Sequence, residues 1–303
     1  MTAEILLTGG SGQVGTALQA LEWPDGLRLV VPSRPELDLA EPAALSRWLA
    51  GRHFQGIINC GAFTGVDAAE AQVAQAWLAN AVAPAILGAH AASRQVPIVH
   101  VSTDYVFDGC KSAPYLENDP VGPVNVYGAA KQGGEQAIRT SRARHVILRT
   151  SWIVSPHGNN FVKTMLRLAG ERPTLRVVND QHGAPTAAQD IAIAIRSILL
   201  RQLTDTTAPS GTYHLAGSGN TTWFGLAEHI LNEAARHGHP LPALEAIPTS
   251  GYPLPARRPA NSRLDCARIA RDYGIVLQPW QAASSEIIRT LLTEAAAATS
   301  GGA

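Results

Sequence analysis

Residues 5–15 read ILLTGGSGQVG, so a short apolar run leads directly into a glycine-rich turn. The run predicts a buried β-strand, and the residues after the turn predict the start of a helix. Glycines at such a turn let the backbone bend tightly and approach a pyrophosphate, whose charge the helix N-terminus stabilises. The pattern reads as Gly10-x-Gly12-x-x-Gly15 or as Gly9-x-x-Gly12-x-x-Gly15. It predicts a dinucleotide-binding βα unit, and the simpler alternative is an ordinary turn.

Similar apolar runs recur along the first half of the chain, and each leaves room for a helix before the next. They lie at residues 29–31, 57–59, 98–101 and 146–149. Strands that are buried on both faces read as continuous apolar runs, so this rhythm predicts a parallel sheet with helices on both sides. The expected fold class is therefore α/β, a Rossmann-type doubly wound parallel sheet with a smaller C-terminal α/β substrate-binding domain.

The rhythm changes after residue 151. Residues 161–169 and 187–203 look helical, residues 177–178 and 213–215 look like strands, and the prolines of residues 240–259 predict an extended loop. Ligands of open α/β sheets bind beyond the carboxyl ends of the strands, so we expect this half to cap that edge. The predicted boundaries are an NAD(P)-binding domain at 1–152 completed by parts of 175–218, a sugar-nucleotide-binding domain at 153–174 and 219–290, and a frayed tail at 291–303.

The composition is that of an ordinary globular chain of 303 residues, of which 46% are hydrophobic and 16% charged. Basic and acidic residues both number 24 and form no long block of one sign, so nucleic acid is not an expected partner. The three cysteines are widely separated and include no Cys-x-x-Cys pair, which indicates neither a disulfide framework nor a zinc site. Since the sequence has no signal-peptide pattern and no 18-residue apolar run, we expect a cytoplasmic protein with no membrane partner.

A tyrosine and a lysine, Tyr127 and Lys131, stand four residues apart. On a helix this spacing puts phenol and ammonium on one face, where the positive charge favours phenolate and makes Tyr127 a candidate proton donor. Ser102 and Thr103 end the fourth apolar run, so Thr103 could polarise a carbonyl group at the same sheet edge. A lone Tyr-x-x-x-Lys pattern occurs by chance, and a strand-end Thr is often a cap. The order of glycine turn, strand-end hydroxyls and Tyr/Lys pair nevertheless favours a hydride-transfer enzyme.

The residues after the second apolar run bear on the choice of cofactor. An acidic residue there would bind the ribose hydroxyls of NAD, whereas an arginine would favour the 2′-phosphate of NADP. Arg34 occupies this place and favours NADPH, although a solvated surface arginine is an equal alternative. Asp38 and Leu39 could lie beside the adenine, or Asp38 could cap the next helix. Residues 60–62 are small and would let a ribose or phosphate lie against the backbone. The alternative is that they form a simple turn.

Two segments of the second half carry candidate contacts to a nucleotide. Arg257 and Arg258 stand with Asn261 in a proline-marked loop, and paired guanidinium groups suit a diphosphate. The alternative is a solvated basic corner. Asn160 could cap the helix that follows it, or present its amide to a nucleobase.

Together these motifs resemble the extended short-chain dehydrogenase/reductase family, and within it the dTDP-4-dehydrorhamnose reductase branch, over nearly the whole chain. The resemblance rests on residues 9–15, 59–70, 102–109, 125–131, 149–152, 158–168, 180–186 and 256–265. It implies reduction of the C4 ketone of dTDP-4-dehydro-β-L-rhamnose by NADPH, or by NADH, in the last step of dTDP-L-rhamnose synthesis.

The resemblance and the motifs above also imply roles for single residues. The catalytic set is Thr103, Tyr127 and Lys131. The expected cofactor contacts are Gly9, Gly12, Gln13, Val14, Gly15, Arg34, Asp38, Leu39, Ala62, Phe63, Thr64, Tyr127 and Lys131. The expected substrate contacts are Thr103, Asp104 and Trp152 at the sugar and Asn160, Arg257, Arg258 and Asn261 at the nucleotide. Ala17 stands where members that use Mg²⁺ at a dimer contact have a glutamate, so no metal is expected here, and the chain is expected to be a monomer or a homodimer.

Three other activities stay open. A 4-ketoreductase for another dTDP-deoxysugar would use the same machinery. A sugar-nucleotide epimerase or dehydratase also draws on a Tyr/Lys pair, but it returns the hydride and consumes no net NADPH. A non-catalytic regulatory subunit, the role that a relative of this fold plays for methionine adenosyltransferase, would be indicated by loss of Thr103, Tyr127 or Lys131, and all three are present.

Overall fold

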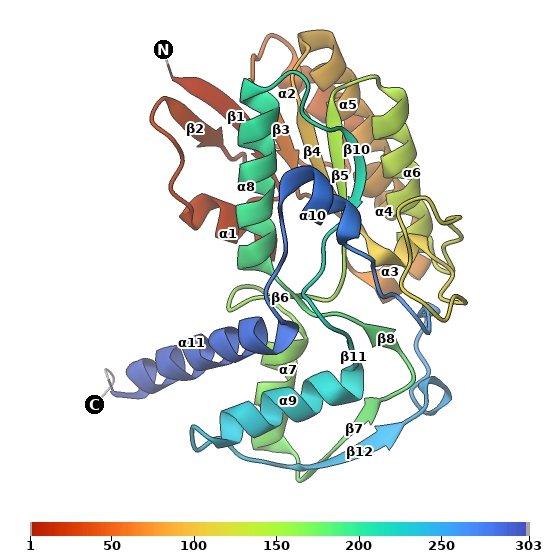
Figure 1. Ribbon diagram of the computed structural model, residues 1–303, viewed down its shortest axis with the longest axis vertical. Helices are drawn as coiled ribbons and strands as arrows, with labels where there is room; N and C mark the ends of the chain where they lie inside the picture. Colours follow the sequence, from red (N-terminus) through yellow and green to blue (C-terminus); the bar gives the residue numbers. More distant parts are fainter. Residues whose placement is uncertain (1, 301–303) are drawn as a thin grey trace.

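The five strands predicted in the first half and the one predicted at residues 213–215 form a six-stranded sheet in which every neighbouring pair is parallel. The structure is a computed structural model and describes residues 2–300 (Figure 1). The sheet order is β10-β5-β4-β3-β1-β2. The strands span β1 Ala3–Thr8, β2 Leu27–Val30, β3 Gly56–Asn59, β4 Ile98–Thr103, β5 His145–Thr150 and β10 Gly211–His214. The α/β fold class predicted from the apolar runs is confirmed.

Helices cover both faces of this sheet, which explains why its central strands read as continuous apolar runs (Figure 1). On one face, α1 (Gln13–Ala20) and α8 (Ala188–Thr204) close a core around β1, β3, β4 and β5. On the other face, α2 (Pro42–Leu49), α5 (Ala83–Arg94) and α6 (Val126–Thr140) close a second core. The sheet and its helices therefore make a doubly wound three-layer lobe.

The direction of winding reverses at β1, which has β2 on one side and β3 on the other. The loops that leave β1 and β3 consequently start on opposite sides of this point and leave a crevice between them. Where the two loops begin, their backbones are in close contact, because a Cβ placed on Gly9 would lie 2.6 Å from Gly61 Cα. Gly9 itself has φ +76°, a left-handed conformation that favours glycine. The glycine-rich turn thus lies at the point of the sheet where ligands of such folds bind.

A second, smaller lobe lies below the carboxyl edge of the sheet (Figure 1). Its core is built from α7 (Phe161–Glu171), α9 (Trp223–Ala235) and α11 (Trp280–Ser300), with β7 (Thr174–Val178) paired in parallel to β12 (Ala243–Ile247). Two short pairs connect the lobes. They are β6 Ile153–Val154 with β9 Thr186–Ala187, and β8 His182–Gly183 with β11 Thr221–Thr222.

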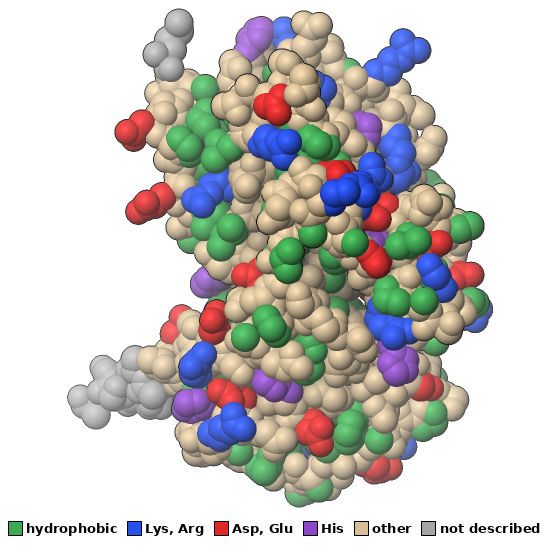
Figure 2. Space-filling view, in the orientation of Figure 1, with side chains coloured by type: hydrophobic (Ala, Val, Ile, Leu, Met, Phe, Trp, Pro, Cys, Tyr) green, Lys and Arg blue, Asp and Glu red, His purple; other side chains and the backbone are tan. Residues whose placement is uncertain are grey.

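The remaining short helices lie in the connections. They are α3 Val66–Ala71, α4 Val73–Trp77, the π-helix η1 Leu78–Val82, the 3₁₀ turns η2 Asp104–Val106 and η3 Thr249–Gly251, and α10 Ala267–Tyr273. No helix of the described residues is both long and apolar enough to cross a membrane. Figure 2 shows basic and acidic side chains interspersed on the face it presents, as the balanced composition indicates.

Several predicted elements of the second half are confirmed, and others are corrected. The helices predicted at residues 161–169 and 187–203 are α7 and α8. The segment 240–259 was predicted to be a loop, but it contains β12. Pairing with β7 provides hydrogen-bond partners for the backbone of the residues between Pro242 and Pro248. The predicted frayed tail is helical in α11 up to residue 300, and residues 301–303 lie outside the described part. Within 219–290, the range assigned to the second domain, α10 packs instead on the sheet lobe through Ile269.

An ion pair with almost no exposed surface joins α6 to the sheet. Glu135 on α6 and Arg149 on β5 are 0% and 2% exposed, and their side chains meet twice, at 2.8 and 2.7 Å. Ser102 Oγ donates to the same carboxylate at 2.7 Å, and Arg139 Nη2 does so at 2.6 Å. Burial alone would raise the pKa of Glu135, but these partners, Arg149 foremost, hold it below its ordinary value. The carboxylate is therefore charged and satisfied inside the protein.

Replacing Glu135 by alanine should destabilise the fold severely, because Arg149 would keep its charge in a buried place without a partner. We expect a loss of about 3–5 kcal/mol in the free energy of unfolding. Glu171→Ala, which breaks the exposed Arg167–Glu171 pair, is the matched control and should cost at most about 1 kcal/mol. Urea unfolding followed by circular dichroism measures both, and similar losses in the two variants would contradict this account.

Candidate active site

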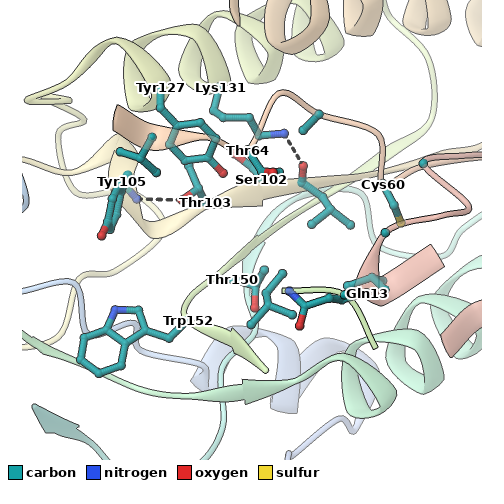
Figure 3. A pocket seen from close by; sticks show the side chains of 18 of the residues that line it. Gln13, Cys60, Thr64, Ser102, Thr103, Tyr105, Tyr127, Lys131, Thr150 and Trp152 are labelled. Carbon is teal, nitrogen blue, oxygen red and sulfur yellow. Dashed lines mark hydrogen bonds between the residues drawn. The ribbon is translucent and has the colours of Figure 1, made fainter. Parts of the chain in front are cut away.

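A cavity of about 560 Å³ opens at the carboxyl edge of the sheet, between the two lobes (Figure 3). The glycine-rich turn forms one end, the carboxyl ends of β3, β4 and β5 form the middle, and residues of the smaller lobe form the opposite wall. The cavity brings together most of the predicted site residues. Those on its wall are Gly9, Gly12, Gln13, Val14, Gly15, Ala62, Thr64, Thr103, Asp104, Tyr127, Lys131 and Trp152.

The glycine-rich end of the cavity has the features of a phosphate cradle. A Cβ on Gly15 would lie 2.1 Å from Gly9 O, so only glycine permits this close turn. Helix α1 begins after Gly12, and no side chain of the described residues caps it by a hydrogen bond. Its first amides are therefore left to a ligand, and the positive end of the helix dipole favours an anion there. The cradle fits the pyrophosphate of a dinucleotide.

The first turn of α6, which carries Tyr127, is held in position by one amide and one carboxylate side chain. Asn125 Oδ1 accepts from Gly128 N at 2.8 Å, and Glu70 Oε1 accepts from Val126 N at 2.9 Å. A Cβ on Gly128 would lie 2.1 Å from Tyr105 O, so the helix approaches the end of β4 as closely as backbone allows. Tyr127 then projects from α6 toward Thr103, and Lys131 projects from the same helix toward the carbonyl oxygen of Val101 (Figure 3).

Desolvation controls the protonation of the Tyr/Lys pair. Burial raises the pKa of Tyr127 to about 12, although the neighbouring Thr103 hydroxyl acts to lower this pKa. It also lowers the pKa of Lys131 to about 8, against the charge of Glu135 that raises it. Lys131 Nζ donates to Val101 O at 2.7 Å. The expectation that Lys131 lowers the pKa of Tyr127 is not met here, because burial dominates at Tyr127, while the charges of Glu135 and Cys60 act on Lys131 itself.

An aromatic wall faces this pair across the cavity. Trp152 lies in parallel against Trp223, with ring centroids 3.6 Å apart and an interplanar angle of 9°. The indole also meets Gly183, where a Cβ would lie 2.5 Å from the ring. Trp152 has φ +44°, an unusual backbone conformation for a bulky residue, and such strain persists only where the surroundings over-determine it. The indole is thus held in one orientation beside the cavity.

Trp223 was not among the residues predicted from the sequence. It opens α9, and Trp223 Nε1 donates to Gln181 Oε1 at 3.1 Å. Only the antiparallel pairing of β8 with β11 brings it beside Trp152. A tryptophan in the first turn of a helix carries no sequence signal for such a place. The other lining residues outside the predicted set are Ser11, Cys60, Val66, Val101, Ser102, Tyr105, Thr150, Ile153, Gly158 and Asn159.

Four predicted cofactor contacts lie off the cavity wall. Arg34 is 82% exposed and its Nε lies 3.2 Å from Asp38 Oδ2. Leu39 packs against Gly61, and the backbone of Phe63 is hydrogen-bonded at both its N–H and its carbonyl to the side chain of Asn80. These residues surround the crevice beyond β2 and β3 without lining it.

The predicted nucleotide contacts are also engaged with the protein. Arg258 makes a two-point ion pair with Asp67 of α3, at 2.9 and 2.7 Å. Asn261 Nδ2 donates to the carbonyl oxygens of residues 111 and 113. Asn160 caps α7 and donates to Gln13 Oε1 at 3.0 Å, which ties the smaller lobe to the glycine-rich turn. Arg257 is exposed.

The residues that the structure describes include no group of three or more His, Cys, Asp or Glu side chains able to hold a metal ion. Ala17, where some relatives with a metal-bridged dimer have a glutamate, is buried in the core between α1 and the sheet.

Comparisons with known proteins converge on one family. Residues 3–293 match the RmlD substrate binding domain family. The dTDP-4-dehydrorhamnose reductase of Burkholderia thailandensis is 42% identical over 96% of this chain and 100% of its own, and that of Sinorhizobium fredii is 40% identical over 96% and 98%. A solved structure of the Bacillus anthracis reductase in complex with NADP has a TM-score of 0.85 and 30% identity, covering 97% of this chain and 100% of its own. The Clostridium acetobutylicum reductase has a TM-score of 0.88 and 31% identity, with coverage of 95% and 99%.

Gly15→Ala should prevent dinucleotide binding, because the added methyl group would collide with the carbonyl oxygen of Gly9. We expect affinity for a reduced nicotinamide dinucleotide to fall by about tenfold or more in a fluorescence titration. Gly170→Ala on α7 is the control, since a Cβ there meets nothing within 4 Å. If Gly15→Ala, shown to be folded by circular dichroism, binds as tightly as Gly170→Ala, the cradle is not the pyrophosphate site.

Proposed function

Because this chain belongs to the RmlD substrate binding domain family, whose matched relatives are dTDP-4-dehydrorhamnose reductases, we propose that it reduces the C4 ketone of dTDP-4-dehydro-β-L-rhamnose to dTDP-L-rhamnose. It is an NAD(P)H-dependent oxidoreductase of dTDP-rhamnose biosynthesis. The observation that carries the proposal is the meeting of Thr103, Tyr127 and Lys131 in one cavity with the glycine-rich turn.

The residues of the cavity divide the work of cofactor binding and proton transfer. The amides at the start of α1 would hold the pyrophosphate, and Lys131 would bind the ribose next to the nicotinamide. When bound, the reduced nicotinamide supplies a hydride. Tyr127 is protonated at neutral pH, because its pKa lies near 12, and it donates its proton to the alkoxide that forms at C4. Thr103 stabilises the same oxygen.

The smaller lobe would bind the rest of the substrate. The wall formed by Trp152 and Trp223 gives the deoxysugar a flat apolar face opposite Tyr127. Arg257 would meet the diphosphate, since its exposed guanidinium lies in the loop that Arg258 and Asp67 hold in place. Binding energy from the remote nucleotide then orients the sugar for reaction.

The direct test is to incubate the protein with dTDP-4-dehydro-β-L-rhamnose and either NADPH or NADH. Loss of reduced nicotinamide, equal to the amount of sugar converted, and dTDP-L-rhamnose as the NMR-identified product would support the proposal. A changed sugar without net loss of the reduced cofactor would indicate an epimerase or a dehydratase. Binding of both ligands without any turnover would favour a non-catalytic role.

Tyr127→Phe should nearly abolish turnover, since phenylalanine keeps the ring but has no proton to give. We expect kcat to fall by roughly 10²–10⁴-fold, the usual contribution of a general acid, with unchanged cofactor affinity. Tyr252→Phe, which alters an exposed tyrosine outside the cavity, should keep wild-type kcat. Retention of more than a small fraction of activity in Tyr127→Phe would refute the assigned proton donor.

Arg34 offers a test of cofactor choice. If its guanidinium binds the 2′-phosphate, Arg34→Ala should weaken NADPH binding by about tenfold or more, the loss expected for a hydrogen bond to a charged group. NADH has no 2′-phosphate, so its affinity should not change. Arg28→Ala removes another exposed arginine on β2 and is the control. Equal effects of Arg34→Ala on the two cofactors would contradict this role.

A further inference from the structure

The hydroxyl of Thr103 lies between an acid and the catalytic phenol. Thr103 Oγ1 donates to Asp104 Oδ1 at 3.0 Å and accepts from Tyr105 N at 3.1 Å. The Tyr127 phenol lies beside this hydroxyl, close enough for Thr103 to lower the pKa of Tyr127 (Figure 3). Thr103 and Asp104 are both almost fully buried, and all four residues line the cavity. The three side chains thus lie in sequence from Asp104 through Thr103 to Tyr127, and a hydrogen bond joins the first two.

The charge of Asp104 determines to which neighbour the Thr103 hydroxyl donates its hydrogen. A hydroxyl has one hydrogen to donate and two lone pairs that accept. While Asp104 is ionised, the Thr103 hydrogen is given to it, and the lone pairs receive Tyr105 N–H and Tyr127 O–H. Thr103 then has nothing to donate to a phenolate. Once Asp104 is protonated, it donates to Thr103, and the Thr103 hydrogen can turn toward Tyr127.

The surroundings of Asp104 favour its protonated form. The residue is 3% exposed, and its Oδ2 has no hydrogen-bond partner within the described chain. Ser262 lies near the carboxyl group, but its hydroxyl donates to His182 O at 3.3 Å. A buried carboxylate without full pairing is costly, and burial raises the pKa of Asp104 to about 7, although Ser262 and Thr103 act to lower it. Asp104 can therefore carry a proton near neutral pH.

We propose that Asp104 is the proton reservoir of this active site and returns a proton to Tyr127 through the Thr103 hydroxyl after each reduction. The proposal rests on the function proposed above. When Tyr127 has given its proton to the alkoxide, an O–H bond exists on the product and a phenolate remains. The Thr103 hydroxyl passes its proton to the phenolate oxygen, and the Asp104 carboxyl passes its own to Thr103. Asp104 is left as a carboxylate and takes a proton from water in the cavity after product release, so no electrons move in the relay.

Few other groups near Asp104 change charge between pH 6 and pH 8. Tyr105 of η2 and Tyr127 of α6 face it, and the pKa of each lies well above this range. The Arg258–Asp67 pair, from the loop after η3 and from α3, acts on Tyr105, and the pKa of Asp67 is below its ordinary value. Lys131 of α6 titrates nearby, since burial lowers its pKa to about 8 against the charges of Glu135 and Cys60. A variant of Asp104 is therefore needed to separate its titration from that of Lys131.

The sign of the pH dependence follows from the direction of transfer. The relay needs the protonated carboxyl, so kcat of the wild type should be highest below the pKa of Asp104 and should fall as pH rises through about 7. Asp104→Asn cannot transfer a proton, so this decline should disappear and kcat at pH 6 should drop by about tenfold or more. Thr103→Val should also lose the decline and should be slower still, because it loses the hydroxyl that stabilises the forming oxygen, whereas Thr103→Ser, which restores a hydroxyl, should keep the decline. The double variant Thr103→Val/Asp104→Asn should be no slower than Thr103→Val alone.

A rapid-mixing experiment separates a relay from a structural role. Each enzyme is mixed with saturating NADPH and dTDP-4-dehydro-β-L-rhamnose. In Asp104→Asn, later turnovers should slow far more than the first, because Tyr127 already carries a proton when the first reduction begins. A residue that only shapes the site would slow the first and later turnovers alike, and that result, or an unchanged pH decline in Asp104→Asn, overturns the proposal.

A measurement without substrate distinguishes failure of the relay from failure of the proposed function. The Asp104 carboxyl is followed by ¹³C NMR during a pH titration, with Asp104→Asn used to assign its signal. A midpoint near 7 supports the reservoir, and a midpoint near the ordinary value of about 4 overturns it. Wild-type protein that fails to reduce the sugar would reject the proposed substrate, while the titration still decides whether Asp104 stores a proton.

Discussion

The arrangement of the active site depends on the buried ion pair between Glu135 and Arg149. A carboxylate inside a protein must be paired, so the contact with Arg149 on β5 and Ser102 on β4 permits one rotation of α6 about its axis. Tyr127, Lys131 and Glu135 are spaced four residues apart and share one helix face. The interaction that satisfies Glu135 therefore also turns Tyr127 and Lys131 into the cavity.

Close backbone contacts set the remaining distances. Gly128 lets α6 reach the turn after β4, and Gly134 lets the same helix approach Asn80 O, where a Cβ would lie 2.1 Å away. Gly15 does the same for α1 and the glycine-rich turn. The backbone amides of the first turn of α6 then donate to the side chains of Glu70 and Asn125. Close backbone packing thus acts together with buried side-chain contacts to place the catalytic groups.

Burial favours the uncharged form of Tyr127, Asp104 and Lys131. It raises the pKa of Tyr127 and Asp104 and lowers that of Lys131. Glu135 is the exception, since Arg149 and Arg139 compensate its charge. A site that reduces a ketone must deliver one proton with each hydride. Neutral acids that are largely shielded from solvent are suited to that task, because they carry protons without attracting counter-ions.

The sequence by itself determined the parallel sheet, the glycine-rich turn, and the Tyr127, Lys131 and Thr103 set, because each is encoded locally. Buried strands read as apolar runs, glycines mark a tight turn, and a four-residue spacing marks one helix face. Only the tertiary structure decided that Trp223 stacks on Trp152, that Arg258 pairs with Asp67, and that β12 forms within a proline-rich segment. It also decided that Asp104 is buried, which raises its pKa to about 7. These features depend on contacts between distant residues and on exclusion of water, which no local pattern of residues records.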